Sequence, residues 1–188
     1  SLFKDEQRRV VEHILAATLG QIHASYRHIY ETNAPLLRFL AGLGIPPPAT
    51  LRQNAEFVLN DEMRRALLPD AGGEPDLGPI RATQREAREQ SIAFDPVTLS
   101  FAVGRALAGA ADRLGQSPRD EARVRQLAEL TTLSIDMPFE VSLWDAQNVY
   151  YDLFHTVLPR VKDERKPEND AWIAAFIDLG HRLRVKVD

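Results

Sequence analysis

The sequence contains no cysteine among its 188 residues. This absence excludes a disulfide framework and thiolate chemistry, and it fits the cytoplasmic location that we expect. No apolar run approaches the roughly 18 residues that a membrane-spanning helix needs, and no stretch resembles a signal peptide. We therefore expect no membrane partner.

Positive charge is not concentrated anywhere along the chain. The 23 Lys and Arg residues are interspersed with 27 Asp and Glu residues, which leaves a net charge of −4. A nucleic-acid-binding protein usually carries a basic stripe or patch. We therefore expect no nucleic-acid partner.

The familiar catalytic signatures are also missing. The chain has neither a Gly-x-Ser-x-Gly nucleophile turn nor a glycine-rich phosphate loop ending in Lys. Carboxylates are plentiful, but none lies on an apolar face where burial would raise its pKa for acid catalysis. Glu140, between Phe139 and Val141, comes closest, and its position near Ser142 favours a role at the start of a helix. We expect no catalytic residue and no cofactor in this chain.

Two pairs match the acid-x-x-His spacing of helical di-iron sites, namely Asp152 with His155 and Asp178 with His181. Di-iron ligands project into the core of a bundle, whereas these residues lie off the apolar stripes of their helices. Solvated polar residues at helical spacing explain both pairs. We assign no metal.

Apolar residues recur with the helical period of 3.6 through most of the chain. The sequence predicts an all-α array or bundle of about eight helices with short loops, in one helical domain over residues 1–188. We expect the helices near residues 4–30, 36–43, 50–67, 76–90, 96–114, 118–134, 142–158 and 170–181. Leu183, Val185 and Val187 alternate with basic residues, which predicts an extended C-terminal tail.

Polar residues and prolines mark the expected helix ends. A break or kink is predicted at Asn33 and Pro35, because the residue before a proline avoids helical angles. Pro159 is expected to end or kink another helix. The helix starts are predicted at Thr50 with Gln53, Asp76, Asp95-Pro96, Ser117-Pro118 and Ser142 with Asp145.

His23, Tyr26 and Tyr30 share one face of the first helix, at spacings of three and four residues. Such a set is typical of the edge of a core, where each hydroxyl group finds a hydrogen-bond partner. We interpret these residues as structural.

The helix predicted for residues 142–158 has two distinct faces. One face centres on Tyr150 and forms a core stripe with Leu143, Ala146, Leu153, Phe154 and Val157. The second face carries Trp144, Asn148, Tyr151 and His155, where a surface helix would normally be polar. Three interpretations stay open: a second packing layer inside the domain, an interface with another domain, or a platform for a sugar.

Several segments resemble a known family. They are residues 3–9 (FKDEQRR), 30–40 (YETNAPLLRFL), 43–46 (LGIP), 56–60 (EFVLN), 138–141 (PFEV) and 143–151 (LWDAQNVYY). Together they resemble the helical domain that lies C-terminal to the catalytic barrel in glycoside hydrolase family 57, the α-amylase and α-mannosidase-like proteins. The resemblance runs over the whole chain.

The resemblance implies a non-catalytic C-terminal domain of a longer, retaining glycoside hydrolase or glucanotransferase. The family's nucleophilic Glu and acid Asp belong to the barrel, and no position of this chain corresponds to them. The first residue is Ser1 rather than Met, so we expect a fragment of a longer protein. The expected partners are the catalytic barrel of the same polypeptide and an α-glucan, with Trp144, Asn148, Tyr151 and His155 as the contact face. The alternative is a stand-alone helical interaction module without any carbohydrate link.

Overall fold

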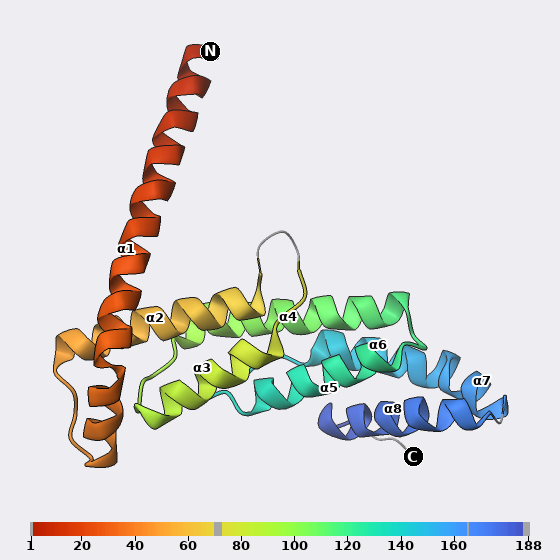
Figure 1. Cartoon of the computed structure of the whole chain (residues 1–188). Coiled ribbons are helices and arrows are strands. Elements are labelled where there is room, and N and C mark those ends of the chain that lie inside the picture. The colour runs from red at the N-terminus through yellow and green to blue at the C-terminus, as the bar shows by residue number, and fades with distance from the viewer. Residues whose placement is uncertain (1, 70–72, 165, 186–188) are drawn as a thin grey trace. The chain divides into compact units, whose positions relative to one another are not determined.

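The computed structural model describes residues 2–69, 73–164 and 166–185 (Figure 1). The chain is 80% helical, and no strand occurs in that part of it, which confirms the all-α prediction. The helices are α1 (Leu2–Gly42), α2 (Ala49–Leu67), α3 (Leu77–Glu89), α4 (Pro96–Gln116), α5 (Glu121–Ile135), α6 (Trp144–Thr156), α7 (Leu158–Asp163) and α8 (Asp170–Arg182), with a short 3-10 turn η2 (Pro167–Asn169) before α8.

Only Val157, itself helical, separates α6 from α7. Counting these as one helix gives seven helices in the described residues, one fewer than expected. The difference lies in α1, which the sequence divided at Pro35 and which is a single helix in the structure.

Pro35 lies inside α1, because the residues before and after it are packed in the core. Ala34 and Leu37 are buried at the centre of a hydrophobic cluster. Proline cannot donate a hydrogen bond to the carbonyl four residues earlier, which normally breaks a helix. The helix nevertheless continues through Pro35, since buried residues on both sides of it are packed in the core. The predicted break was therefore wrong, because tertiary packing outweighs the local preference.

The chain divides into two compact units, whereas the sequence suggested one domain. Unit 1 comprises Ser1–Glu62 and Thr83–Phe94, and unit 2 comprises Met63–Ala82 and Asp95–Asp188. The boundaries between the units fall within α2, within α3 and in the segment between α3 and α4.

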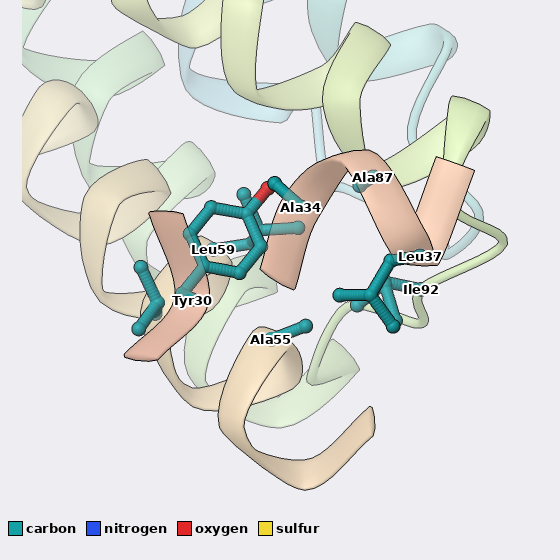
Figure 2. Close-up of a cluster of buried hydrophobic side chains, with 8 residues drawn as sticks. Tyr30, Ala34, Leu37, Ala55, Leu59, Ala87 and Ile92 are labelled. Atoms are coloured by element: carbon teal, nitrogen blue, oxygen red, sulfur yellow. The ribbon is translucent and has the colours of Figure 1, made fainter. Parts of the chain in front are cut away.

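The core of unit 1 is a small cluster built from the second half of α1 (Figure 2). Leu51 and Phe94 pack against its rim. The cluster consists of Tyr30, Ala34 and Leu37 from α1, Ala55, Val58 and Leu59 from α2, Ala87 from α3, and Ile92 just after it. It contains no residue of the first half of α1.

The core of unit 2 is formed where α4 packs on α5 and α6, and α5 packs on α8. One face of α4 is buried along the whole helix and is rich in alanine, which lets neighbouring helices approach closely. The buried residues of α4 are Leu99, Ala102, Val103, Ala106, Leu107, Ala110, Ala111 and Leu114.

Three aromatic rings fix α6 against α8. Tyr150 stacks on Phe176 with a centroid distance of 4.4 Å, and Trp172 stacks on the same ring at 4.8 Å. The indole N–H of Trp172 donates to the Pro118 carbonyl over 3.0 Å. Ala146 and Leu153 are buried with Tyr150, which confirms the centre of the predicted core stripe, whereas Leu143 and Val157 are half-buried. Phe154 is only half-buried.

Two of the predicted N-caps are confirmed. The Asp95 carboxylate accepts a hydrogen bond from the Val97 N–H over 3.0 Å, and Pro96 opens α4. The Asp76 carboxylate accepts one from the Gly78 N–H over 3.1 Å at the start of α3. Each satisfies a backbone donor that the helix leaves unpaired.

Three other predicted starts were wrong. Ser117 ends α4, and Asp120 caps α5 instead, because its longer carboxylate reaches two backbone N–H groups. Ser142 lies before the first residue of α6 and accepts only a long bond, 3.4 Å, from the Trp144 N–H. Thr50 lies inside α2 rather than at its cap.

The described part of the C-terminal tail is a turn rather than an extended segment. Leu183 is buried, and its carbonyl accepts a hydrogen bond from the side-chain amide of Gln147 over 2.8 Å. Arg184 has a left-handed backbone with φ of 56°. Val187 lies outside the described residues. The anchorage on α6 explains why the alternating pattern did not produce an extended chain.

We predict that Phe176→Ala lowers the free energy of unfolding by about 3–5 kcal/mol, because a buried ring in contact with two others is lost. The matched control is Phe101→Ala, since Phe101 is 67% exposed on α4. The control should change the free energy by no more than about 0.5 kcal/mol. Urea unfolding of both variants measures the difference, and equal losses would show that the stack is not a core.

Candidate functional site

The structure places all four predicted site residues on one exposed row of α6. Trp144, Asn148, Tyr151 and His155 follow each other at spacings of four, three and four residues, so they share a face. Trp144 is 66% exposed and Tyr151 is 61% exposed. Asn148 and His155 are exposed as well. We call these four residues the α6 row.

These exposures exclude one of the three interpretations of the α6 row. A second packing layer inside the chain would bury the Trp144 and Tyr151 rings, whereas most of each ring is open to solvent. An interface with another protein domain and a platform for a sugar both stay open. The Trp144 and Tyr151 rings are thus open to solvent in the described chain.

Packing on the opposite side of α6 fixes the position of the α6 row. Tyr150 is fully buried against Phe176 on the opposite side of the helix. Within the row, the rings of Tyr151 and His155 meet edge to face with centroids 4.4 Å apart. Phe154 meets the other side of His155 at 5.3 Å. The row is thus presented by a helix whose orientation its own core fixes.

A second exposed surface lies on α1, and the sequence did not identify it as a site. Every residue from 4 to 22 is exposed, including the apolar ones. The apolar face continues to Ile29 and consists of Val11, Ile14, Leu15, Leu19, Ile22 and Ile29, each 42–58% exposed. We call these six residues the α1 stripe.

The α1 stripe is not the face that builds the core of unit 1. Core residues such as Tyr30 and Ala34 lie roughly 90° around the helix from the stripe's centre. Helical periodicity reports only that a face is apolar, so it could not separate a face packed within the chain from one that is left open. Only the length of α1 indicated an open face, because an apolar periodic helix of this length is longer than a small core can cover.

Tyr30 organises a polar network beside the core of unit 1. Its hydroxyl donates to the Glu86 carboxylate over 3.1 Å and accepts from the Gln90 amide over 2.7 Å. The Arg38 guanidinium donates to the same carboxylate over 2.7 Å. This confirms the structural interpretation of Tyr30.

The two other residues of that face also pack structurally. The rings of His23 and Tyr26 both contact Phe57, at centroid distances of 5.2 Å and 4.8 Å. His23 also lies 3.4 Å from the carboxylate of Asp61. The first helix therefore contributes an aromatic edge here rather than a catalytic group.

The network shifts the pKa of Glu86. Burial alone would raise the pKa of this carboxyl, but hydrogen bonds from Arg38, Tyr30 and Gln90 and the charge of Arg38 outweigh it. The pKa is therefore lower than that of an ordinary glutamate. Burial also raises the pKa of Tyr30. The hydrogen bonds that shift these pKa values hold Tyr30, Glu86 and Arg38 in one arrangement. Burial raises the pKa of Glu62, so the expectation that burial would raise the pKa of no carboxylate was wrong.

The carboxylates show no arrangement suited to metal binding within the described chain. No group of three or more His, Cys, Asp or Glu side chains there could hold an ion. Asp178 pairs with Arg182 over 2.8 Å, and Asp152 and His155 are exposed.

A hollow of about 510 Å³ lies in unit 2 beside the segment that precedes α6. Most of its lining residues are apolar, and Glu140 and Arg184 are its charged members. The full lining is Ser134, Ile135, Met137, Pro138, Phe139, Glu140, Val141, Leu143 and Arg184. A single exposed carboxylate does not provide the pair of groups that acid–base catalysis of glycoside cleavage uses.

Comparison with family models, curated proteins and solved structures gives no match to this chain. Within the described residues, no helix has the length and apolar character to cross a membrane. The resemblance to glycoside hydrolase family 57 therefore stays a prediction from the sequence segments quoted above.

We predict that Glu86→Gln destabilises the chain by about 1–2 kcal/mol near pH 7, because hydrogen bonds to a charged group are lost. A carboxyl whose pKa is depressed in the folded state contributes stability above its unfolded pKa. That contribution is lost as the pH falls through the folded pKa. The difference between wild type and Glu86→Gln should therefore shrink below about pH 4, the usual glutamate range.

Urea unfolding at several pH values provides the measurement. Glu6→Gln is the control, since Glu6 is exposed near the start of α1. A difference for Glu86→Gln that stays constant down to pH 2 would contradict the network.

Proposed function

We propose that this chain is a non-catalytic helical domain that packs on the catalytic barrel of a glycoside hydrolase family 57-like protein. The observation that carries the proposal is the α1 stripe, an aliphatic face that is 42–58% exposed in the described part of the chain. The parent protein would cleave or transfer α-glucosidic bonds with two barrel carboxylates. The cytoplasmic location belongs to the same proposal.

The size of the α1 stripe supports a partner that is a folded protein. From Val11 to Ile29 it extends about 27 Å, close to the diameter of a small domain. Exposed apolar patches larger than a few hundred Å² mark interaction sites on soluble proteins. Each aliphatic side chain that a partner removes from water contributes about 1.5–3 kcal/mol if it becomes fully buried. A small ligand could cover only a fraction of such a surface.

The chemistry of the α1 stripe also favours protein over other ligands. Its six members are aliphatic, and its gaps at Thr18 and Ser25 are small and uncharged. A helix with this surface packs its ridges into the grooves of a neighbouring helix at a separation of about 8–10 Å. The sequence resemblance provides the candidate neighbour, namely the outer surface of the catalytic barrel in the same family.

A second candidate function is a stand-alone helical interaction module without any carbohydrate link. The same α1 stripe favours it, because the stripe would fit any partner with an apolar groove of similar length. The two candidates differ in what covers α1: a catalytic barrel in the first, and an unrelated protein in the second.

We predict that Leu15→Gln with Ile22→Gln leaves the melting temperature of the 188-residue chain nearly unchanged. Both side chains are already about half exposed, and Gln is a good helix former. In the presence of the catalytic barrel, the same double variant should weaken association by about 100-fold or more, because central apolar anchors are lost. His13→Gln, on the opposite side of α1, is the control and should bind as wild type does.

Calorimetry with the separately produced barrel, or domain dissociation in the joined protein, measures this effect. Unchanged association would refute barrel docking through α1. If the chain alone forms a dimer that the double variant abolishes, the partner is a second copy and the proposal is wrong.

We further predict that the 188-residue chain alone does not hydrolyse maltooligosaccharides. A retaining glycosidase needs two carboxyl groups about 5–5.5 Å apart on either side of the bond. In the hollow beside α6, Glu140 is the one carboxylate among the described lining residues. Product analysis after long incubation is the measurement, and turnover that copurifies with the chain would contradict the non-catalytic assignment.

A further inference from the structure

We propose that the hollow of about 510 Å³ in unit 2 binds a short apolar peptide with free termini, such as a dipeptide of two aliphatic residues. The ammonium group of the peptide faces Glu140, its carboxylate faces Arg184, and its side chains lie on the apolar wall. All residues that line the hollow belong to unit 2. The inference is therefore independent of which protein covers α1 in unit 1.

The size of the hollow matches a dipeptide. Ligand pockets have volumes of about 300–1,000 Å³, and this hollow lies within that range. A water molecule occupies about 30 Å³ in the liquid, so the hollow has room for about 17 water molecules. A dipeptide of two leucines contains a similar number of non-hydrogen atoms.

The wall of the hollow suits aliphatic side chains. Met137 is buried, and Phe139, Val141 and Leu143 are half-buried, so packing already orders the wall before a ligand arrives. Apolar groups of a ligand gain free energy when they leave water for such a surface. Little conformational freedom is lost when the side chains that receive them are already ordered.

Glu140 and Arg184 give the hollow two opposite charges that the chain itself does not use. Both side chains are exposed, and neither makes an ion pair within the described residues. A carboxylate only accepts hydrogen bonds, whereas a guanidinium only donates them. A ligand that carries both an ammonium group and a carboxylate satisfies the two side chains at once. Apolar amino acids and peptides combine these two charges with an apolar body.

The end of α5 favours a positive charge in the same hollow. Ser134 and Ile135 are the last two residues of α5, and both line the hollow. The C-terminus of a helix carries a partial negative charge, which attracts cations within its last turn. Together with the Glu140 carboxylate, this helix end provides a negative region that suits the ammonium group of the ligand.

Arg184 occupies a backbone position that glycine normally fills. It follows Leu183, the C-cap of α8, and its φ is 56°. Its N–H donates to the His181 carbonyl over 3.1 Å. The next N–H, of Val185, donates to the Gly180 carbonyl over 3.0 Å, which completes a Schellman motif. A left-handed backbone strains any residue with a Cβ atom, so the guanidinium beside the hollow is retained at a cost in stability. Strain of this kind is typical of functional positions.

Other classes of ligand fit the hollow less well. A fatty acid has the carboxylate and the apolar chain, but its charge is repelled by Glu140. A phosphate-bearing ligand meets the same repulsion. A metal ion would find one carboxylate among the described lining residues. A neutral ligand would leave both charged side chains without a partner.

NMR titration of the 188-residue chain with the dipeptide Leu-Leu tests the inference. The amide signals of residues 134–143 and of Arg184 should shift with a Kd of about 0.1–1 mM, as expected for a small ligand in an open site. Gly-Gly, which lacks apolar side chains, should not shift them at the same concentrations. N-acetyl-Leu-Leu and Leu-Leu amide each lack one terminal charge, and both should bind about tenfold more weakly than Leu-Leu.

Arg184→Gly separates a binding role of Arg184 from a structural one. The variant should raise the melting temperature by about 2–4 °C, because the backbone strain is relieved. The Kd for Leu-Leu should rise by about tenfold or more, because the charge-assisted hydrogen bonds are lost. Ser91→Gly is the matched control, since Ser91 has a φ of 55° in unit 1. It should also raise the melting temperature, but it should leave the Kd unchanged.

Glu140→Gln tests the other end of the ligand. It should raise the Kd for Leu-Leu by about tenfold while the melting temperature stays nearly constant, because Glu140 is exposed. Asp112→Asn is its control, since it removes an exposed carboxylate from α4 of the same unit. This control should bind Leu-Leu as wild type does.

Four outcomes would overturn the inference. The first is the absence of shifts at residues 134–143 up to about 10 mM Leu-Leu, tenfold above a millimolar Kd. The second is equal binding of Leu-Leu and N-acetyl-Leu-Leu, because the ammonium group would then have no role. The third is an Arg184→Gly variant that binds as wild type does. The fourth is a fall in the melting temperature of Arg184→Gly, which would make Arg184 a structural residue.

Discussion

Tyr150 and Phe176 lie ring on ring in unit 2, and this contact determines which face of α6 is open to solvent. A helix that buries one stripe must present the opposite one. Burial raises the pKa of Tyr150 to about 12, so the residue stays neutral as a packing group. Its hydroxyl has no hydrogen-bond partner among the described residues. Trp172 completes the stack and is tied to the loop before α5. The exposed position of Trp144 and Tyr151 follows from this packing.

The α1 helix also buries one face and exposes another, but its exposed face is aliphatic. Its second half supplies Tyr30, Ala34 and Leu37 to the core of unit 1, whereas residues 4–22 touch none of that core. Helix stability in proteins comes mainly from the packing of an apolar face. We propose that a partner covers the six exposed aliphatic residues of the α1 stripe.

Much of the fold could be predicted from the sequence, because the helical periodicity of apolar residues and the N-cap residues are both local signals. Asp95 and Asp76 marked true helix starts, and the Tyr150 stripe was placed on the correct side of α6. The errors occurred where distant contacts decide. The α1 helix continues through Pro35 because the residues beside it are buried. The chain turns at Leu183 because the Gln147 side-chain amide donates a hydrogen bond to the Leu183 carbonyl. The α6 row was predicted as a face, but only the burial of its neighbours showed that it is open. The α1 stripe was missed as a site, since periodicity does not state what covers a face.

Amide hydrogen exchange along α1 tests the central claim most directly, because it reports the packing of this helix without any substitution. Exchange of residues 4–22 is to be compared in the 188-residue chain and in the complex with the catalytic barrel. In the chain alone, these amides should exchange much faster than those around Tyr30 and Leu37, since no tertiary contact holds them. With the barrel present, the account predicts that residues 4–22 become protected along the α1 stripe. Equal exchange in both states would show that the barrel does not cover α1 and would contradict the account.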